Sequence, residues 1–186
     1  MYEIRWYGRG GQGAVTASHI LVDAAYKDGY EGVQAFPFFG AERRGAPVKA
    51  FTRISKTTIY TRSQIYEPDA IIVLDPTLLD IVDVTEGLKK GGIIIANTNE
   101  IPEKWRNKEW EIYTVDATAI ALKVGLVIAG SPVLNTPMLG AFAKATGLVK
   151  LERIKEAIRN KWKGKTGERN IKAAELAYGQ CRLVTS

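Results

Sequence analysis

The chain has 186 residues and a formal net charge of +6, and 46% of its residues are hydrophobic and 25% charged. This balance is typical of an ordinary soluble globule and argues against a disordered or low-complexity chain. One cysteine and one histidine exclude an intrachain disulfide, an iron–sulfur cluster ligated by this chain alone, and a histidine–cysteine zinc site.

Length and charge also limit the organisation of the chain. A chain of this length favours a single domain. The opening residues carry no signal-peptide pattern, and no apolar run reaches the roughly 20 residues that cross a bilayer, so we expect a cytoplasmic protein without membrane contact. The basic residues are scattered and dense only at 43–44 and 161–165. This pattern favours a solvated basic surface, or one that meets phosphates or acidic partner subunits, over nucleic-acid binding.

The N-terminal segment predicts a strand, a glycine loop and a helix. Residues 2–7 are aromatic and β-branched, with one apolar and one more polar face, and residues 8–13 are rich in glycine. Apolar positions spaced by three and four predict a helix over 14–27, which ends at Asp28 and Gly29. A second strand follows over 32–36, and an apolar loop then runs to Pro47.

The middle of the chain predicts the core of a sheet. Residues 48–54 and 57–61 read as an antiparallel hairpin, because a two-residue connection cannot make a parallel crossover. The continuous apolar runs 70–74 and 92–96 are typical of strands that helices cover on both faces. A helical pattern over 77–90 lies between them.

The remaining sequence is mostly helical after one short strand over 111–115. Helices are predicted over 116–124 and 135–146, then around Leu151, Ile154 and Ile158, and finally up to about Cys181, with the basic segment 161–167 as a flexible loop. Strands alternating with helices predict an α/β fold. We expect a Rossmann-like three-layer α/β/α domain with a mixed sheet and a helical C-terminal part.

The strongest chemical motif is the loop Gly8-Arg9-Gly10-Gly11-Gln12-Gly13 between the first strand and the first helix. Glycines let backbone approach a phosphate, and the helix start offers free N–H groups. A nicotinamide site would need an acidic residue at the end of the second strand, but Glu31 precedes that strand and Glu42 lies well past it. Phosphate binding of another kind is the leading interpretation, and tight helix–strand packing is the alternative.

Three further features each allow a structural and a functional interpretation. The aromatic and arginine-rich segment 35–48 contains Arg43 and Arg44 and favours a subunit interface, although its rings could instead fold inward. Polar residues over 130–137 and Asp75 could bind a ligand or cap helices. His19 and Cys181 read as packing or surface residues, and no nucleophile–base set appears.

Several separated motifs resemble those of one family. They are Gly8 to Ala14 after the opening strand, Gln34-Ala35-Phe36-Pro37, Gly40-Ala41-Glu42-Arg43-Arg44-Gly45-Ala46-Pro47, Ala50 to Ile54, Pro68-Asp69, Leu74-Asp75, and Asn135-Thr136-Pro137-Met138-Leu139-Gly140-Ala141. In this order the motifs resemble the gamma chain of 2-oxoacid:ferredoxin oxidoreductases. The resemblance implies one gamma domain over 1–186, with a core over 1–147 and C-terminal helices over 148–186.

The resemblance implies a function within a heterotetrameric enzyme that oxidatively decarboxylates a 2-oxoacid to an acyl-CoA and reduces ferredoxin. Thiamine diphosphate is then expected between the alpha and beta chains, and iron–sulfur clusters on the delta chain. The gamma chain, inactive in isolation, is expected to be scaffold and part of the coenzyme A site. Pyruvate is the leading substrate, with branched-chain 2-oxoacids and 2-oxoglutarate as alternatives.

The expected coenzyme A contacts are Gly10, Gly11, Gln12 and Gly13. Arg43 and Arg44 are expected to contact either coenzyme A or a partner subunit. A free-standing NAD(P)-binding oxidoreductase and a purely structural assembly subunit remain as alternatives.

Overall fold

The computed structural model describes residues 1–38, 45–106 and 109–184. Its centre is a seven-stranded sheet in the order β2-β3-β1-β4-β5-β6-β9, and a two-stranded hairpin pairs β7 with β8. The strands are β1 (Tyr2–Arg9), β2 (Gly32–Pro37), β3 (Pro47–Ser55), β4 (Ala70–Val73), β5 (Ile93–Asn97), β6 (Glu111–Val115), β7 (Val127–Ile128), β8 (Ser131–Pro132) and β9 (Arg182–Val184).

The sheet is mixed, as the sequence predicted. Strands β1, β4, β5 and β6 run parallel, while β3 is antiparallel to both of its neighbours, β1 and β2. The predicted hairpin over 48–61 is wrong, because 57–61 forms no strand. Both edges of β3 are already hydrogen-bonded to β1 and β2, so no edge is left for a further strand.

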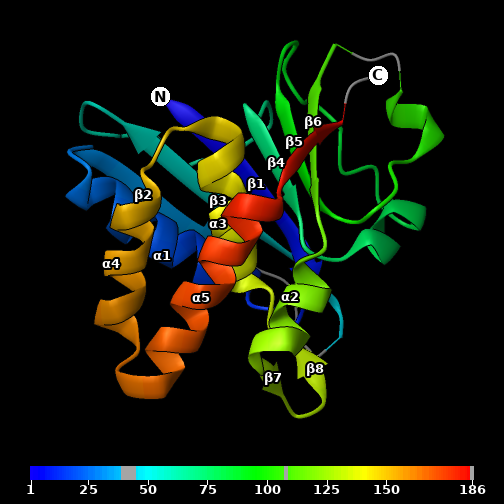
Figure 1. Ribbon diagram of the computed structural model, residues 1–186. Helices are drawn as coiled ribbons and strands as arrows, with labels where there is room; N and C mark the ends of the chain where they lie inside the picture. Colours follow the sequence, from blue (N-terminus) through cyan, green and yellow to red (C-terminus); the bar gives the residue numbers. More distant parts are fainter. Residues whose placement is uncertain (39–44, 107–108, 185–186) are drawn as a thin grey trace.

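In the described part of the chain, five α-helices accompany the sheet: α1 (Ala14–Lys27), α2 (Ala117–Val124), α3 (Asn135–Thr146), α4 (Leu151–Lys161) and α5 (Gly164–Gln180). Figure 1 shows α1, α3, α4 and α5 gathered on one side of the sheet. Their apolar faces share one core with the strand residues that point to that side, among them Ile4, Trp6 and Ile72. Helices α3 and α5 pack in close contact because Gly140 has no Cβ, which would otherwise lie 2.0 Å from the carbonyl oxygen of Ala174.

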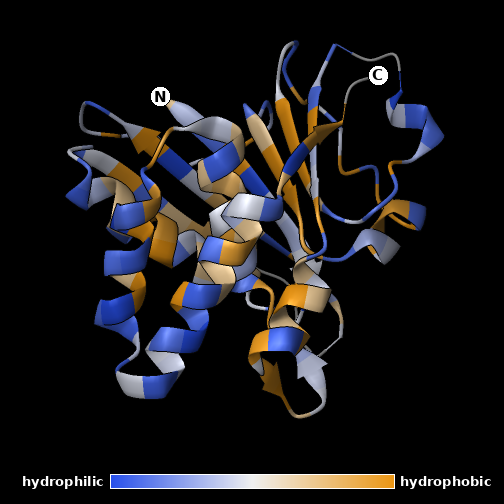
Figure 2. Ribbon diagram, viewed as in Figure 1, coloured by the Kyte–Doolittle hydropathy of each residue, from blue (hydrophilic) through white to orange (hydrophobic). Residues whose placement is uncertain are grey.

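The opposite face of the sheet is covered by loops and by two 3-10 helices, η1 (Pro76–Asp80) and η2 (Glu103–Trp105). The alternate strand residues, such as Ile71, Val73 and Ile94, form a second core there with Leu78 and Trp105. Figure 2 shows the resulting apolar character of β4 and β5. Both faces of these strands are therefore covered, by α-helices on one side and by loops with two 3-10 helices on the other, where the sequence predicted helices on both.

The helix predicted over 77–90 is wrong, since only the 3-10 helix η1 forms in its first turn. Asp83 draws the chain into a local turn, because its Oδ1 accepts hydrogen bonds from the Thr85 amide and hydroxyl at 3.0 and 2.7 Å. Gly87 then adopts φ +72° with its Cα against the carbonyl of Tyr66, which a side chain would prevent. Local side-chain bonds therefore override the helical pattern.

Two buried arginines hold the irregular segment 57–69 against the sheet. Arg53 is 1% exposed, forms a 2.8 Å ion pair with Glu3, and donates to the carbonyls of Ser63 and Gln64. Arg5 is also buried and donates to the carbonyls of Ile65 and Tyr66. The polar side of β1 is thus covered by protein rather than by water.

The C-terminal part departs from the prediction in two places. The basic segment 161–167 is not a long loop, because α4 ends at Lys161 and α5 begins at Gly164. After α5 comes β9, an edge strand antiparallel to β6 that the sequence pattern did not predict. No helix in the described ranges is long and apolar enough to span a membrane.

Candidate functional site

The glycine loop lies where the carboxyl ends of β1 and β4 meet. The two strands are parallel neighbours, and the amide of Leu74 donates to the carbonyl of Tyr7 at 2.7 Å. The residue after Leu74 is Asp75, so this carboxylate is brought next to the loop that follows β1. In open α/β sheets this edge is the usual place for a ligand.

The Gln12 side chain makes hydrogen bonds within the loop and to Asp75. Its Oε1 accepts from the Arg9 amide at 2.7 Å, and its Nε2 donates to Asp75 Oδ2 at 2.7 Å. Its backbone is paired as well, with its amide donating to the Arg9 carbonyl and its carbonyl accepting from Leu134. Gln12 therefore shapes the loop through groups that are already satisfied.

Asp75 connects the loop to η1. Its Oδ1 accepts from the amide and the hydroxyl of Thr77 at 2.9 and 2.6 Å, and its Oδ2 lies 3.2 Å from Nε of Arg9. Burial alone would raise the pKa of the Asp75 carboxyl, but the hydrogen bonds from Thr77 and Gln12, helped by Arg9, outweigh it and hold that pKa below its ordinary value. The carboxylate is thus ionised at neutral pH and fully engaged.

Helix α1 begins at the loop without a side-chain cap. Its N-cap is Gly13, at φ +93°, and among the described residues no side chain makes a capping hydrogen bond there. A Cβ at Gly13 would lie 3.0 Å from Cβ of Asn135, so the loop and the start of α3 fit together only with glycine here. The uncapped start of a 14-residue helix presents N–H groups and a positive dipole end.

A cavity of about 730 Å³ opens beside this helix start. Its wall includes the beginnings of three helices, with Ala14 on α1, Asn135 on α3 and Thr166 on α5. Leu126 and Val133 supply an apolar wall. The volume lies within the range of roughly 300–1,000 Å³ typical of small-molecule sites.

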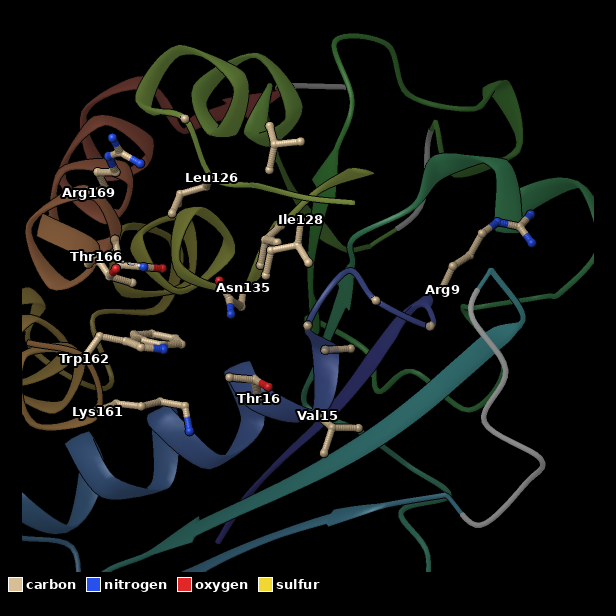
Figure 3. Close-up of a pocket in the computed structure, with 18 of the residues that line it drawn as sticks. Arg9, Val15, Thr16, Leu126, Ile128, Asn135, Lys161, Trp162, Thr166 and Arg169 are labelled. Atoms are coloured by element: carbon tan, nitrogen blue, oxygen red, sulfur yellow. Dashed lines mark hydrogen bonds between the residues drawn. The ribbon is translucent and has the colours of Figure 1, made fainter. Parts of the chain in front are cut away.

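The side of the cavity formed by α4 and α5 is cationic and aromatic. Lys161, Trp162 and Arg169 line it, and Figure 3 shows them on the side opposite the glycine loop. Within the described ranges neither Lys161 nor Arg169 forms an ion pair, although Lys161 lies 5.5 Å from the Trp162 ring centroid. Two cations without counter-ions next to an indole can hold an anionic, partly aromatic ligand.

The structure places the predicted ligand residues unequally. Gly10, Gly11 and Gly13 line the cavity, whereas the side chain of Gln12 is turned toward Asp75. Arg9 contributes to the wall, but its guanidinium points away from the cavity (Figure 3) and donates to Thr77 and the Gly45 carbonyl. Arg43 and Arg44 lie outside the described residues.

The described rings of the aromatic segment pack partly inward, which was the structural interpretation of this segment. Phe36 packs on the buried Phe51 with ring centroids 5.2 Å apart, while Phe38 meets the same ring edge-on and stays 41% exposed. The rings that are described thus fold onto the sheet, with Phe38 left at the surface.

Of the remaining candidates, Asn135 lines the cavity, whereas Asp75, His19 and Cys181 do not. Asp75 caps η1, and Asn135 Oδ1 accepts from the Thr136 amide at 2.7 Å. His19 is exposed on α1. Cys181 is buried, and that burial raises the pKa of its thiol to about 11. Among the described residues no group of histidine, cysteine and carboxylate side chains could hold a metal ion.

The topology argues against a nicotinamide site. In a Rossmann unit the strand after the first helix pairs with the first strand, and an acidic residue at its end holds the ribose. Here β3 lies between β1 and β2, and β2 carries no acidic residue from Gly32 to Pro37. Among the described residues, the geometry that would hold an NAD ribose is therefore not formed.

These features describe an α/β domain with a glycine-rich loop, a cationic cavity and no metal or nucleophile site of its own in the described ranges. Residues 3–180 match the family described as pyruvate ferredoxin/flavodoxin oxidoreductase, and the chain belongs to this family. The α/β fold and the family resemblance expected from the sequence are thereby confirmed.

Relatives match the chain from end to end. The pyruvate/ketoisovalerate oxidoreductases common subunit gamma of Thermococcus kodakarensis is 59% identical and covers 97% of both chains. Pyruvate synthase subunit PorC of Methanocaldococcus jannaschii is 56% identical, again over 97% of both. The crystal structure of pyruvate oxidoreductase subunit PORC from Thermotoga maritima has a TM-score of 0.84 at 39% identity, covering 99% of this chain and 98% of that one. The homologues are thus gamma-type subunits of an oxidoreductase with ferredoxin as acceptor.

Proposed function

We propose that this chain is the gamma subunit of a 2-oxoacid:ferredoxin oxidoreductase, with pyruvate as the favoured substrate, and that it binds coenzyme A in the cavity at the glycine loop. The observation that carries the proposal is the pairing of an uncapped α1 start with Lys161 and Arg169 across one cavity. Coenzyme A carries a pyrophosphate and a separate ribose phosphate, so it needs two anion positions in one site.

Each part of the cavity suits one part of that ligand. The glycine loop and the first turn of α1 suit the pyrophosphate, because backbone N–H groups and the helix dipole attract anions. Lys161 and Arg169 suit the ribose phosphate, and the Trp162 indole suits the adenine ring. The apolar wall at Leu126 and Val133 leaves room for the uncharged arm.

The redox cofactors belong to other chains in this proposal. The only thiol is the buried Cys181, whose raised pKa disfavours the thiolate that an iron cluster needs. Thiamine diphosphate is therefore assigned to the alpha and beta subunits and the iron–sulfur clusters to the delta subunit, which would pass electrons to ferredoxin. The chain is then one gamma domain of a cytoplasmic complex, without nucleic-acid partners.

The cationic half of the site is tested by kinetics of the assembled complex. Arg169→Ala and Lys161→Ala should each raise the KM for coenzyme A about tenfold and leave kcat unchanged, because each removes one charge-assisted contact made in ground and transition state alike. With dephospho-coenzyme A, which lacks the ribose phosphate, the same variants should behave like the wild type. Lys165→Ala is the matched control, since Lys165 is exposed on the same helix and does not line the cavity.

The glycine-loop half needs its own variant. Gly11 is exposed at φ +93°, so Gly11→Val should distort the loop without touching the core. If assembly and the coenzyme A KM were both untouched, the loop would serve packing alone and the structural alternative would hold.

The assembly and its substrate are tested by purification from the native cell. A tagged chain should co-purify with larger subunits that reduce a low-potential dye in the presence of coenzyme A and pyruvate. Activity confined to a branched-chain 2-oxoacid or 2-oxoglutarate would replace pyruvate as substrate. A lone protein that binds NAD(P) in titrations would overturn the subunit assignment.

A further inference from the structure

Asp75 is a buried carboxylate beside the site that does not line the cavity. We infer that Asp75 is a positioning residue, which holds the glycine loop in the shape that receives coenzyme A; the inference rests on the function proposed above. Asp75 touches no ligand in this view and acts through Gln12 and Arg9.

The loop depends on such an anchor because its tip has no side chains to fix it. Gly10 and Gly11 form the tip. Gly10 is held by backbone hydrogen bonds to Ala46 and Gly45, whereas Gly11 is exposed at φ +93°. Glycine backbone is the most conformationally free of all residues, so the turn at Gly11 would sample many shapes without the ligand. Each shape other than the binding one lowers the apparent affinity for the ligand.

Gln12 carries the constraint from Asp75 into the loop. Its Nε2 donates to Asp75 Oδ2 and its Oε1 accepts from the Arg9 amide, so one side chain ties the carboxylate to the residue that precedes the tip. A Cβ at Gly8 would lie 3.3 Å from Gln12 Oε1, which shows how closely this amide is packed beneath the loop. Losing the carboxylate would leave the Gln12 amide free to turn.

Asp75 also fixes where the Arg9 charge goes. The guanidinium lies 3.2 Å from Asp75 Oδ2 at Nε, and its Nη2 donates to Thr77 Oγ1 at 2.8 Å. Thr77 in turn donates to Asp75 Oδ1. The three side chains form a closed set on the far side of the loop from the cavity, which keeps a long cationic side chain out of the loop tip.

The experiment uses the assembled complex and compares two carboxylates that make the same bonds to a threonine two residues on, the buried Asp75 and the exposed Asp83. Asp75→Asn should raise the KM for coenzyme A about tenfold with kcat unchanged at saturation, because a carboxylate accepting from Gln12 and Arg9 is replaced by an amide. Asp83→Asn is the control: Asp83 makes the same pair of bonds to Thr85 but has no link to the glycine loop, so its coenzyme A KM should match the wild type.

A double-mutant cycle separates positioning from general damage. If Asp75 acts through Gln12, then Asp75→Asn combined with Gln12→Met should raise the KM little more than the larger single change. Additive effects in the cycle, an unchanged KM in Asp75→Asn, or an equal rise in Asp83→Asn would each overturn the inference.

Thr77→Val tests the inference if the Asp75→Asn chain does not assemble into the complex. Thr77 is exposed, and its hydroxyl links Arg9 to Asp75, so its loss should raise the coenzyme A KM about threefold without loss of assembly. An unchanged KM in that variant would overturn the inference. If Arg169→Ala raises the KM while Asp75→Asn and Thr77→Val do not, the proposed function stands and only the positioning role fails; if none of them does, the coenzyme A site itself is wrong.

Discussion

Replacing Gly140 with alanine tests how closely α3 and α5 must pack. An added Cβ would lie 2.0 Å from the carbonyl oxygen of Ala174 and 2.9 Å from its Cα. Close carbon–oxygen contacts between helices are about 3.3–3.6 Å, so the two helices must part by roughly 1.3 Å. The obstacle is backbone and cannot rotate away.

The expected cost follows from two opposing effects. Overpacking a core costs about 1–3 kcal/mol, and a clash with backbone belongs at the upper end of that range. Alanine regains about 1 kcal/mol of helix propensity over glycine, which leaves a net loss of about 2 kcal/mol. With a urea slope of about 2 kcal/mol per molar, the unfolding midpoint of the purified chain should fall by about 1 M.

The control for Gly140→Ala is Gly179→Ala, on α5. An added Cβ at Gly179 meets nothing within 4 Å, so this variant should unfold at the wild-type midpoint or slightly above it. Tryptophan fluorescence in urea measures both variants. A midpoint for Gly140→Ala at or above the wild-type value would refute the close-packing argument, and with it the reason why α5 can bring Arg169 to the cavity.

The remaining predictions concern buried ionisable groups. Arg53→Met should lower the free energy of unfolding by about 3–5 kcal/mol in a thermal melt, because it leaves the Glu3 carboxylate and the carbonyls of Ser63 and Gln64 without their donor. The control Arg62→Met, at an exposed position, should change that free energy by no more than about 0.5 kcal/mol. Burial raises the pKa of the Cys181 thiol to about 11, so a thiol reagent at pH 8 should label the native chain far more slowly than the urea-unfolded chain; fast native labelling would contradict its burial. Burial also raises the pKa of Tyr2, so both Tyr2 and Cys181 hold their protons more tightly in the folded state than in the unfolded state. Their contribution to stability is therefore complete below about pH 9 and is lost as the pH rises. We expect the Tm to fall between pH 9 and about pH 11.

The elements that the sequence predicted well are those with local causes. The apolar spacing of α1 and its end at Asp28 gave the observed bounds, and Asp116 caps α2 through a 2.8 Å bond from the Ala119 amide. The apolar runs of β4 and β5 also formed as strands. In each case the pattern within the segment decides the structure, because burial and capping act over a few residues.

The elements that failed depend on partners far along the chain. Residues 57–61 have a strand pattern but meet a strand whose edges are taken, and the carbonyls that Arg53 and Arg5 hold lie just after them, at Ser63 and Ile65. β9 forms only because β6 leaves an edge free at the end of the sheet. Sequence spacing carries no information about which edges remain open.

The residues of the candidate site also separate into those that the local sequence predicts and those that only the fold brings together. The glycine loop was visible in the sequence because its chemistry is contiguous, whereas Lys161 and Trp162 were assigned to a basic loop over 161–167 and Arg169 was not singled out. Only the return of α5 onto α3, permitted by Gly140, brings that basic segment to the loop. The density of cations at 161–165 was the one available signal, and its target was hidden by the fold.

This division has a consequence for selectivity in the proposed site. Backbone amides at the α1 start attract any phosphate, so the loop alone cannot separate coenzyme A from other nucleotides. Selection has to come from side chains that read a second anion, and in the described structure those are Lys161 and Arg169 on the opposite wall. Loop variants should therefore weaken coenzyme A and dephospho-coenzyme A alike, while variants of the cationic wall should weaken coenzyme A alone. Asp75 shapes the loop without touching the wall, so Asp75→Asn should weaken the binding of both ligands, as the loop variants do. If Asp75→Asn weakened the binding of only one of the two ligands, Asp75 would not act through the loop.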